Sequence, residues 1–198
     1  SKKVMNPSRY EWNTIDWRKL EKIVFKLQKR IYRASLRNDV KRVHKLQRLL
    51  LKSEAARLLA VRRVTQDNQG RKTAGVDGVA NLKPDERLHL AATLKLDEKS
   101  KPVRRVWIPK PGKTEKRPLG IPTIAERAKQ MLVKLGIEPE WEAKFEPNSY
   151  GFRPGRSCHD ACLAIFIALT KKTAFVLDAD ISGCFDNIDQ TALLIKLN

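Results

Sequence analysis

The 198-residue sequence has few of the features that mark secreted or membrane-spanning proteins. It contains three cysteines, an odd number that is too small for a disulfide framework in a chain of this length. It has no signal-like apolar run, and no stretch approaches the roughly 20 apolar residues that are needed to cross a bilayer. We therefore expect a soluble, intracellular protein with no membrane partner.

The cysteines that are present do not suggest a metal site. Cys158 and Cys162 are spaced to lie on one face of a helix, with His159 between them. His159 would point away from that face, and no second pair of ligands follows in the sequence. We expect the two thiols to be buried in the core as small apolar groups.

Acidic residues are scarce, so the charge is unbalanced: 22 Asp and Glu stand against 41 Lys and Arg, for a net charge of +19. The excess is uneven, because residues 1–72 hold 21 basic and 6 acidic side chains, whereas residues 73–198 hold 20 and 16. Such an excess is either a solvated face without a specific partner or a binding surface for a polyanion. Its concentration at one end favours a nucleic-acid partner.

Two amphipathic helices are predicted in this basic segment. Asp16 can cap the first, and Asn38 or Asp39 the second, whose inward-facing apolar positions continue to Leu58. An antiparallel pair of such helices gives a broad cationic surface suited to folded RNA, where phosphate positions and shape matter more than base edges. A membrane surface is the alternative, but the apolar faces are suited to packing against each other. The outward faces carry the candidate RNA-binding residues Lys22, Lys26, Lys29, Arg30, Lys41, Arg42 and Lys45.

A glycine-rich segment, residues 70–78, follows the basic helices. It is a conceivable phosphate cradle, but it lacks the Gly-Lys-Ser/Thr ending of a P-loop and no predicted strand precedes it. We interpret it as a structural turn in which glycines supply left-handed backbone angles. A further helix is expected from about Pro84 to Leu96.

A β-hairpin is predicted next, with strands at 103–109 and 117–122 around a polar Pro/Gly turn. Lys110 and Arg117 then lie on facing strand ends, where they can hold a triphosphate, Arg by a forked contact and Lys as a point charge. A solvated basic hairpin is the alternative. Thr123 is placed to cap a helix that runs to about Gly136.

Residues 148–157 form an aromatic and arginine-rich turn, followed by a helix capped by Ser157. Such a turn can contact a nucleic-acid strand by stacking, although packing of Tyr150 and Phe152 explains it equally well. Residues 176–181 then predict a buried strand that ends in acidic residues and turns at Gly183.

A carboxylate at a strand end, beside an aromatic on the following turn, is the arrangement with which a polymerase palm holds Mg²⁺ next to a nucleotide. Mg²⁺ prefers oxygen ligands and often combines one or two carboxylates with substrate phosphates. Palm-type sites usually take a second acidic cluster from downstream, and this sequence contains no Asp-Asp pair. We therefore expect it to carry only half of a catalytic site.

Taken together, these segments resemble the reverse transcriptases encoded by group II introns, the maturase type. The resemblance is close over about residues 75–197 and looser over 12–65, where it rests on basic helices like those of the family's N-terminal extension. Five motifs carry the resemblance, in this order: Gly-Val-Asp-Gly, Arg-Arg-Val-Trp-Ile-Pro-Lys-Pro, Arg-Pro-Leu-Gly-Ile-Pro-Thr, Asn-Ser-Tyr-Gly-Phe-Arg-Pro-Gly-Arg-Ser and Asp-Ala-Asp-Ile-Ser-Gly-Cys-Phe-Asp-Asn-Ile. Other reverse-transcriptase lineages (retron, diversity-generating or CRISPR-associated) fit less well, because the long basic extension and the Gly-Val-Asp-Gly motif favour the intron type.

The resemblance implies roles for residues near the C-terminal end. Asp180 resembles the first catalytic aspartate of the palm, and the carbonyl of Ile181 would be a further metal ligand. Phe185 resembles the residue that packs under the sugar and excludes ribonucleotides. Asp178 and Asp186 are not expected to be metal ligands, although Asp178 lies on the same strand face as Asp180.

The resemblance also implies roles for the hairpin. Lys110 and Arg117 match the fingers residues that hold the incoming triphosphate. Ile121 and Pro122 lie where the templating base is supported, and Arg104 is similar to a contact with the template backbone.

The implied fold class is α+β: the fingers and partial palm of a right-hand polymerase, helix-rich with a small antiparallel sheet and truncated before the second catalytic motif. The expected domains are a basic helical RNA-binding extension over 1–72, fingers over 73–172 and the start of the palm over 173–198.

The implied function is that of an RNA-directed DNA polymerase that binds intron RNA for splicing and copies RNA into DNA with two Mg²⁺ ions, as in retrotransposition. The expected partners are group II intron RNA, an RNA template with a DNA primer, dNTPs, and either a C-terminal remainder or a second copy of the chain. We expect the 198 residues not to polymerise alone. The alternative is a non-catalytic RNA-binding module that assists splicing. The bacterial cytoplasm or an organelle would suit either.

Overall fold

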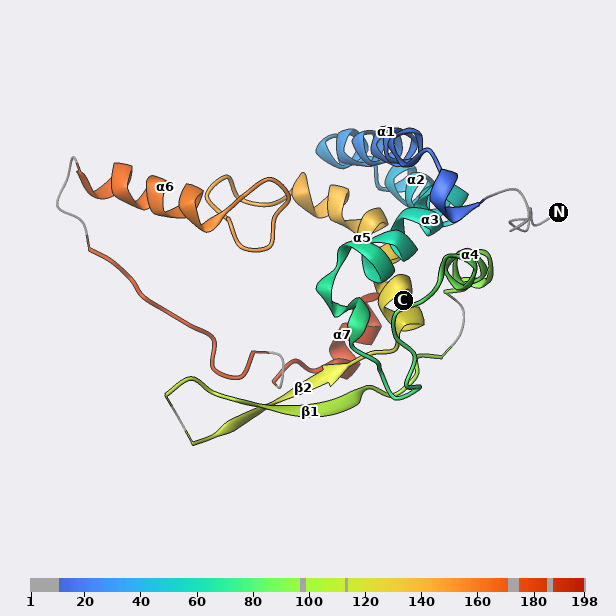
Figure 1. Ribbon diagram of the computed structural model, residues 1–198. Coiled ribbons are helices and arrows are strands. Elements are labelled where there is room, and N and C mark those ends of the chain that lie inside the picture. Colours follow the sequence, from blue (N-terminus) through green and yellow to red (C-terminus); the bar gives the residue numbers. More distant parts are fainter. Residues whose placement is uncertain (1–10, 97–98, 113, 171–174, 185–186, 198) are drawn as a thin grey trace. The chain divides into compact units, whose positions relative to one another are not determined.

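The computed structural model describes residues 11–96, 99–112, 114–170, 175–184 and 187–197, and the chain separates into two compact units, residues 1–146 and 147–198 (Figure 1). Each unit is described by itself. Among the described residues, no helix has both the length and the apolar character that crossing a membrane requires.

The first unit is a helical body with one hairpin. Its helices are α1 (Trp17–Leu36), α2 (Val40–Leu51), α3 (Glu54–Arg62), α4 (Pro84–Thr93) and α5 (Ile124–Glu142). The strands are β1 (Arg104–Pro109) and β2 (Lys116–Ile121). Three further short helices are the 3-10 helices η2 (Trp12–Thr14) and η4 (Gln69–Lys72) and the π-helix η3 (Arg63–Asp67). The described part of the chain is thus helix-rich with a small antiparallel sheet, as predicted.

Acidic caps start the two basic helices where the sequence predicted them. The Asp16 carboxylate accepts a hydrogen bond from the Lys19 amide, and that of Asp39 accepts one from the Arg42 amide, both at 3.0 Å. Each cap satisfies an amide that has no partner within its helix and places negative charge at the positive end of the helix dipole.

The predicted second helix is in fact two helices. The chain leaves the helical conformation at Ser53, whose backbone is extended, and restarts as α3 with Glu54 in its first turn. Serine favours the position before a helix, and a glutamate in the first turn complements the helix dipole, so this sequence favours a new start. Leu58 is fully buried as predicted, but it belongs to α3.

The core of this unit forms around α3. Nearly every face of α3 is covered, because it packs against α1, α4 and α5. Its alanines, Ala55, Ala56 and Ala60, let the neighbouring helices approach closely. The apolar faces of the surrounding helices supply large buried side chains, among them Ile31, Leu50, Leu132 and Leu135.

Two hydrogen bonds from α1 dock α5. Pro139 lies inside α5 and has no amide hydrogen, so the carbonyl of Leu135, four residues earlier, lacks its helical donor. The Gln28 side chain supplies the missing bond, with Nε2 at 3.0 Å from the Leu135 oxygen. Nearer the end of α5, the Ser35 hydroxyl donates to the Glu140 carbonyl, one of the last four carbonyls, which have no partner within the helix.

The glycine-rich segment is a structural turn, as interpreted from the sequence, and it is fastened to the start of α5. The Arg127 guanidinium donates to the carbonyls of Gly70 and Thr73, at 2.7 and 2.5 Å. Gly78 has a positive φ of 70°, whereas Gly75 serves a different need: a Cβ there would lie 2.7 Å from the backbone of Thr123. Thr123 caps α5 as predicted, although the helix continues past Gly136 to Glu142.

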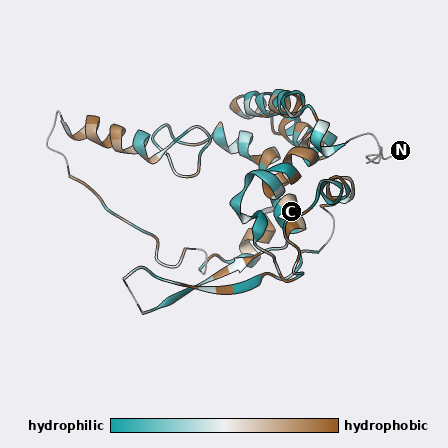
Figure 2. Cartoon of the chain, viewed as in Figure 1, coloured by the Kyte–Doolittle hydropathy of each residue, from teal (hydrophilic) through white to brown (hydrophobic). Residues whose placement is uncertain are grey.

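The second unit contains α6 (Cys158–Thr170) and α7 (Gln190–Leu197), and it corrects two predictions. Residues 175–181 form no strand: they are irregular and exposed, with Leu177 at 90%. A lone extended segment has no ladder to satisfy its backbone, and the described residues contain no strand beside it. Cys158 and Cys162 are exposed instead of buried. They lie on α6, which is rich in apolar residues (Figure 2) but has no buried residue.

Candidate nucleic-acid interface

The seven cations predicted to bind RNA all lie exposed on α1 and α2. Within the part of the chain that the structure describes, none of the seven pairs with a carboxylate. Glu21, the acidic residue within α1, lies 3.5 Å from Arg62 instead. Unpaired cations on rigid helices are available to phosphates without first breaking an ion pair.

Four of these cations meet in one groove. Arg30 of α1 lies beside Lys41, Arg42 and Lys45 of α2 around an open depression of about 670 Å³. The antiparallel packing of the two helices brings them together, because the chain reverses within three residues after Leu36. The groove therefore concentrates positive charge from segments that the sequence separates by ten or more residues.

The hairpin places three of the predicted template and nucleotide residues on one face. Arg104 pairs with Ile121 in the antiparallel register, and Ile108 pairs with Arg117. Paired residues share a face and alternate residues return to it, so Arg104, Arg117 and Ile121 lie on the same side. Four residues of strand separate the Arg104 level from the Arg117 level, or roughly 13 Å.

Lys110 follows β1 in the same alternation, at the tip of the hairpin. Its ammonium lies 2.8 Å from the carboxylate of Glu115. This hydrogen bond and the lysine charge hold the pKa of Glu115 below its ordinary value. To hold a triphosphate, Lys110 would exchange Glu115 for a phosphate oxygen.

Asp180 and Ile181 lie in the second unit. The Asp180 carboxylate is exposed and accepts a hydrogen bond from the Ile181 amide at 2.9 Å. Its carboxylate and the Ile181 carbonyl are hard oxygen donors of the kind that Mg²⁺ prefers, but they are two of the roughly six ligands it takes. The described residues contain no group of three His, Cys, Asp or Glu side chains that could hold a metal. Phe185 and Asp186 lie outside the described residues.

The two aromatic residues of the turn at 148–157 differ in their contacts and exposure. The Arg156 guanidinium lies 5.4 Å from the centre of the Tyr150 ring and donates to the Pro147 carbonyl. Phe152, by contrast, has a positive φ and a wholly exposed ring. Tyr150 therefore packs within the protein, which is one of the two explanations that the sequence offered for this turn. The Phe152 ring, in contrast, is open to a partner.

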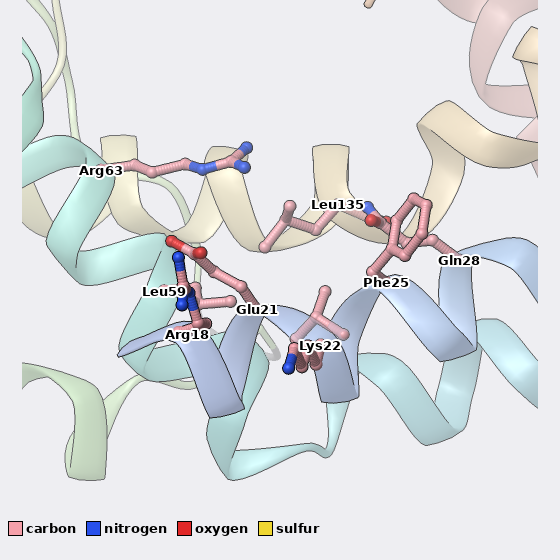
Figure 3. A pocket seen from close by; sticks show the side chains of 9 residues that line it. Arg18, Glu21, Lys22, Phe25, Gln28, Leu59, Arg63 and Leu135 are labelled. Carbon is pink, nitrogen blue, oxygen red and sulfur yellow. The ribbon is translucent and has the colours of Figure 1, made fainter. Parts of the chain in front are cut away.

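Sequence reasoning missed Phe25 and Arg63, which face a pocket between α1, α3 and α5 (Figure 3). The signal for Phe25 was present: an aromatic residue stands on the polar side of a helix, between Lys22 and Lys29. Arg63 had no such signal, because the turn that follows α3 decides where its side chain lies.

Two family models match most of the chain. A family model for the N-terminal domain of reverse transcriptase matches residues 12–94, and a model for reverse transcriptase (RNA-dependent DNA polymerase) matches residues 108–198. The basic helices fall in the first match, and most of the hairpin and Asp180 fall in the second. The two matches define the class of the protein as a reverse transcriptase.

Individual relatives narrow the class. The chain is 32% identical to Protein YkfC of Escherichia coli over 87% of this chain and 47% of the relative. It is 34% identical to maturase-like protein 1 of Euglena gracilis, over 78% of this chain and 34% of the relative. It is 44% identical to the group II intron-encoded protein LtrA of Lactococcus lactis, over 49% of this chain and 16% of the relative.

The chain belongs to the family of group II intron-encoded reverse transcriptases and maturases, as the sequence motifs predicted. It spans less than half the length of these three relatives.

Proposed function

We propose that this chain is the N-terminal part of an RNA-directed DNA polymerase that binds intron RNA for splicing and copies RNA into DNA. In this proposal residues 1–72 form the RNA-binding extension, 73–172 the fingers and 173–198 the start of the palm. The observation that carries it is the set of exposed, unpaired cations on α1 and α2, in a chain of the maturase family.

RNA binding is proposed for the α1–α2 surface. Its cations are arranged on a rigid helical frame, so they present fixed positions to the phosphates of a folded RNA. The contacts should be largely electrostatic, and each phosphate contact contributes about 0.7 to 0.9 to the slope of log affinity against log salt.

The test compares two double variants with equal net charge. Lys41→Gln with Lys45→Gln removes two groove cations, and we expect roughly 10- to 100-fold weaker binding to intron RNA at low salt, with the salt slope reduced by about 1.5. Lys134→Gln with Lys144→Gln removes two cations that already pair with Glu138 and Glu140. Equal losses in the two variants would mean that net charge, not this surface, binds the RNA.

For DNA synthesis, we propose that Lys110 and Arg117 hold the triphosphate of the incoming dNTP, while Arg104, Ile121 and Pro122 support the template. Asp180 and the Ile181 carbonyl would hold Mg²⁺, and Phe185 would contact the sugar. When bound, two Mg²⁺ ions would supply charge neutralisation at the attacking and leaving oxygens. The protein would contribute positioning: the hairpin fixes the cations, and Lys110 leaves Glu115 as the triphosphate arrives.

We further propose that residues 1–198 do not polymerise alone, because Asp180 and Ile181 provide too few ligands for two metal ions. Primer extension on an RNA template, with Mg²⁺ and dNTPs, tests this. Incorporation that is lost on Asp180→Ala would overturn it. Restored incorporation on adding a segment with paired aspartates, or on self-association of the chain, would identify what completes the site.

The alternative function is a non-catalytic RNA-binding module that assists splicing. It is favoured by the separation of the basic helices, all in the first unit, from Asp180 in the second. Asp180→Asn should then leave unchanged both the affinity for RNA and the splicing of intron RNA that the protein assists. Loss of RNA binding in this variant would contradict the separation of roles.

A further inference from the structure

The pocket between α1, α3 and α5 (Figure 3) shares no lining residue with the groove between α1 and α2. Its volume is about 330 Å³, at the lower end of the roughly 300–1,000 Å³ typical of small-molecule sites. Its floor is apolar, since Val24, Leu59 and Leu135 are each at most 4% exposed. A flat apolar group of modest size fits such a floor, whereas a duplex does not.

Phe25 stands at the edge of this floor. Its ring is 59% exposed, so the helix gains little from burying it. The Lys29 ammonium lies 5.5 Å from the ring centre, a cation–π contact that keeps the ring beside positive charge. In Figure 3 the ring of Phe25 and the side chain of Arg63 lie on either side of Leu135. An exposed aromatic ring over an apolar floor is a stacking platform.

The rim of the pocket is cationic. Arg18, Lys22 and Arg63 line it, and within the described residues none of the three pairs with a carboxylate. Glu21 also lines the pocket, but its carboxylate lies 3.5 Å from the Arg62 guanidinium. The rim therefore favours an anionic ligand, and the forked guanidinium of Arg18 or Arg63 suits a phosphate.

Gln28 gives the pocket a directed polar group. Its NH₂ must face the Leu135 carbonyl at 3.0 Å, because a carbonyl oxygen only accepts, so the orientation of the amide is fixed. The Gln28 amide oxygen then remains as an acceptor at the pocket wall, with no hydrogen-bond donor among the described residues. It can accept from an exocyclic amino group, which adenine, cytosine and guanine carry and uracil lacks.

We propose that this pocket takes one unstacked nucleotide of the bound RNA. Its base stacks on Phe25 over the apolar floor, its flanking phosphates contact Arg18, Lys22 and Arg63, and its amino group donates to Gln28. The proposal rests on the proposed RNA-binding function and adds a base-reading site to an otherwise electrostatic surface. A peptide side chain is the competing occupant, and the experiment below separates the two.

The test measures binding of labelled oligoadenylate and oligouridylate 12-mers to the full chain. Phe25→Ala should weaken oligoadenylate binding about 5- to 150-fold, the range of one lost base stack. Because the lost contact is not ionic, the salt slope should not change, unlike the slope of the groove variant. Phe25→Tyr should bind within about twofold of the wild type, and oligoadenylate should bind more tightly than oligouridylate.

The matched control is Trp141→Ala. Trp141 is also a half-exposed aromatic under a lysine, with the Lys144 ammonium 5.0 Å from its ring, but it does not line the pocket. This variant should bind like the wild type. A 2-aminopurine in the oligoadenylate gives a direct readout, because its fluorescence should be quenched on binding to the wild type and not on binding to Phe25→Ala.

The outcomes separate the two proposals. If the wild type binds RNA and Phe25→Ala binds equally well without a change in quenching, the nucleotide pocket is wrong and the electrostatic surface stands. If the wild type binds neither oligomer at low salt, the RNA-binding proposal fails and this inference with it. A loss shared equally by Phe25→Ala and Trp141→Ala would also overturn it.

Discussion

Gly75→Ala tests how the glycine-rich turn is joined to α5. A methyl group at this position would lie 2.7 Å from both the N and the Cα of Thr123 and 3.0 Å from the carbonyl carbon of Pro122. Ordinary contacts begin at 3.4 Å, so the two backbone segments must separate by about 0.7 Å. All three atoms belong to the backbone, so no side-chain rotation relieves the overlap.

The expected cost follows from two effects. Overpacking of this kind costs roughly 1–3 kcal/mol. Displacement of Thr123 also weakens its cap on α5, where its hydroxyl accepts from the Glu126 amide at 3.2 Å, and a lost cap costs about 1 kcal/mol. The reduced freedom of the unfolded alanine chain offsets about 0.5 kcal/mol. We expect a net destabilisation of about 2–3 kcal/mol, or a melting temperature lowered by roughly 5–12 °C.

Urea denaturation followed by circular dichroism measures this cost. Gly78→Ala is the control for backbone strain: it has a positive φ but open space around it, and should cost about 1 kcal/mol. Gly151→Ala has neither constraint and should change stability by less than about 0.5 kcal/mol. If Gly75→Ala were no more destabilising than Gly151→Ala, the turn would not be fastened to α5 as described.

Three further predictions follow from the packing and the charges. Leu50→Ala, at a fully buried position, should destabilise the first unit by about 2–5 kcal/mol in the same denaturation assay, and a cost below 1 kcal/mol would contradict its place in the core. Burial raises the pKa of Glu140, but hydrogen bonds from Lys144 and Gln47 outweigh it and hold the pKa below its ordinary value. Glu140 therefore contributes stability above pH about 4.5 that is lost as the pH falls through its folded pKa, and Glu140→Gln should flatten the stability–pH curve in that acidic range, not near neutrality. Limited proteolysis should cut within residues 147–198 first, because α6 has no buried residue, and mass spectrometry should then find a protected fragment ending near residue 146.

Local signals in the sequence predicted much of the first unit. The caps at Asp16 and Asp39 and the presence of the hairpin were accessible because each depends on a few neighbouring residues. The register of the hairpin was not, since Arg117 lies opposite Ile108 and not opposite Lys110. The break at Ser53 was missed, since the apolar spacing continues across it and only the packing of a separate α3 reveals the interruption. Ile23 of α1 stands at an apolar position of the helical spacing and is nevertheless 42% exposed, because periodicity alone does not set how wide a helix face the neighbours cover.

The candidate site also has features that the sequence predicts and features that depend on packing. The exposure of the cations on α1 and α2 could be read from their helical spacing, whereas the shared face of Arg104 and Arg117 depends on the register between two strands. The buried strand predicted at residues 176–181 was wrong, because a strand depends on partners that lie elsewhere in a chain, and the described residues contain no strand beside this segment. The pocket at Phe25 depends on three helices meeting, so no local pattern describes it.

The proline in α5 has a consequence for how precisely this unit assembles. Apolar helix faces tolerate sliding, since one turn of shift replaces one set of apolar contacts with a similar set. Pro139 leaves a single carbonyl in the middle of α5 that must find its donor on another helix, and Gln28 reaches it at one register only. Pro139→Ala would let α5 complete its own hydrogen bonding and would remove that demand. The hydrogen bond that Pro139 removes from α5 is therefore what fixes the position of α1 along α5.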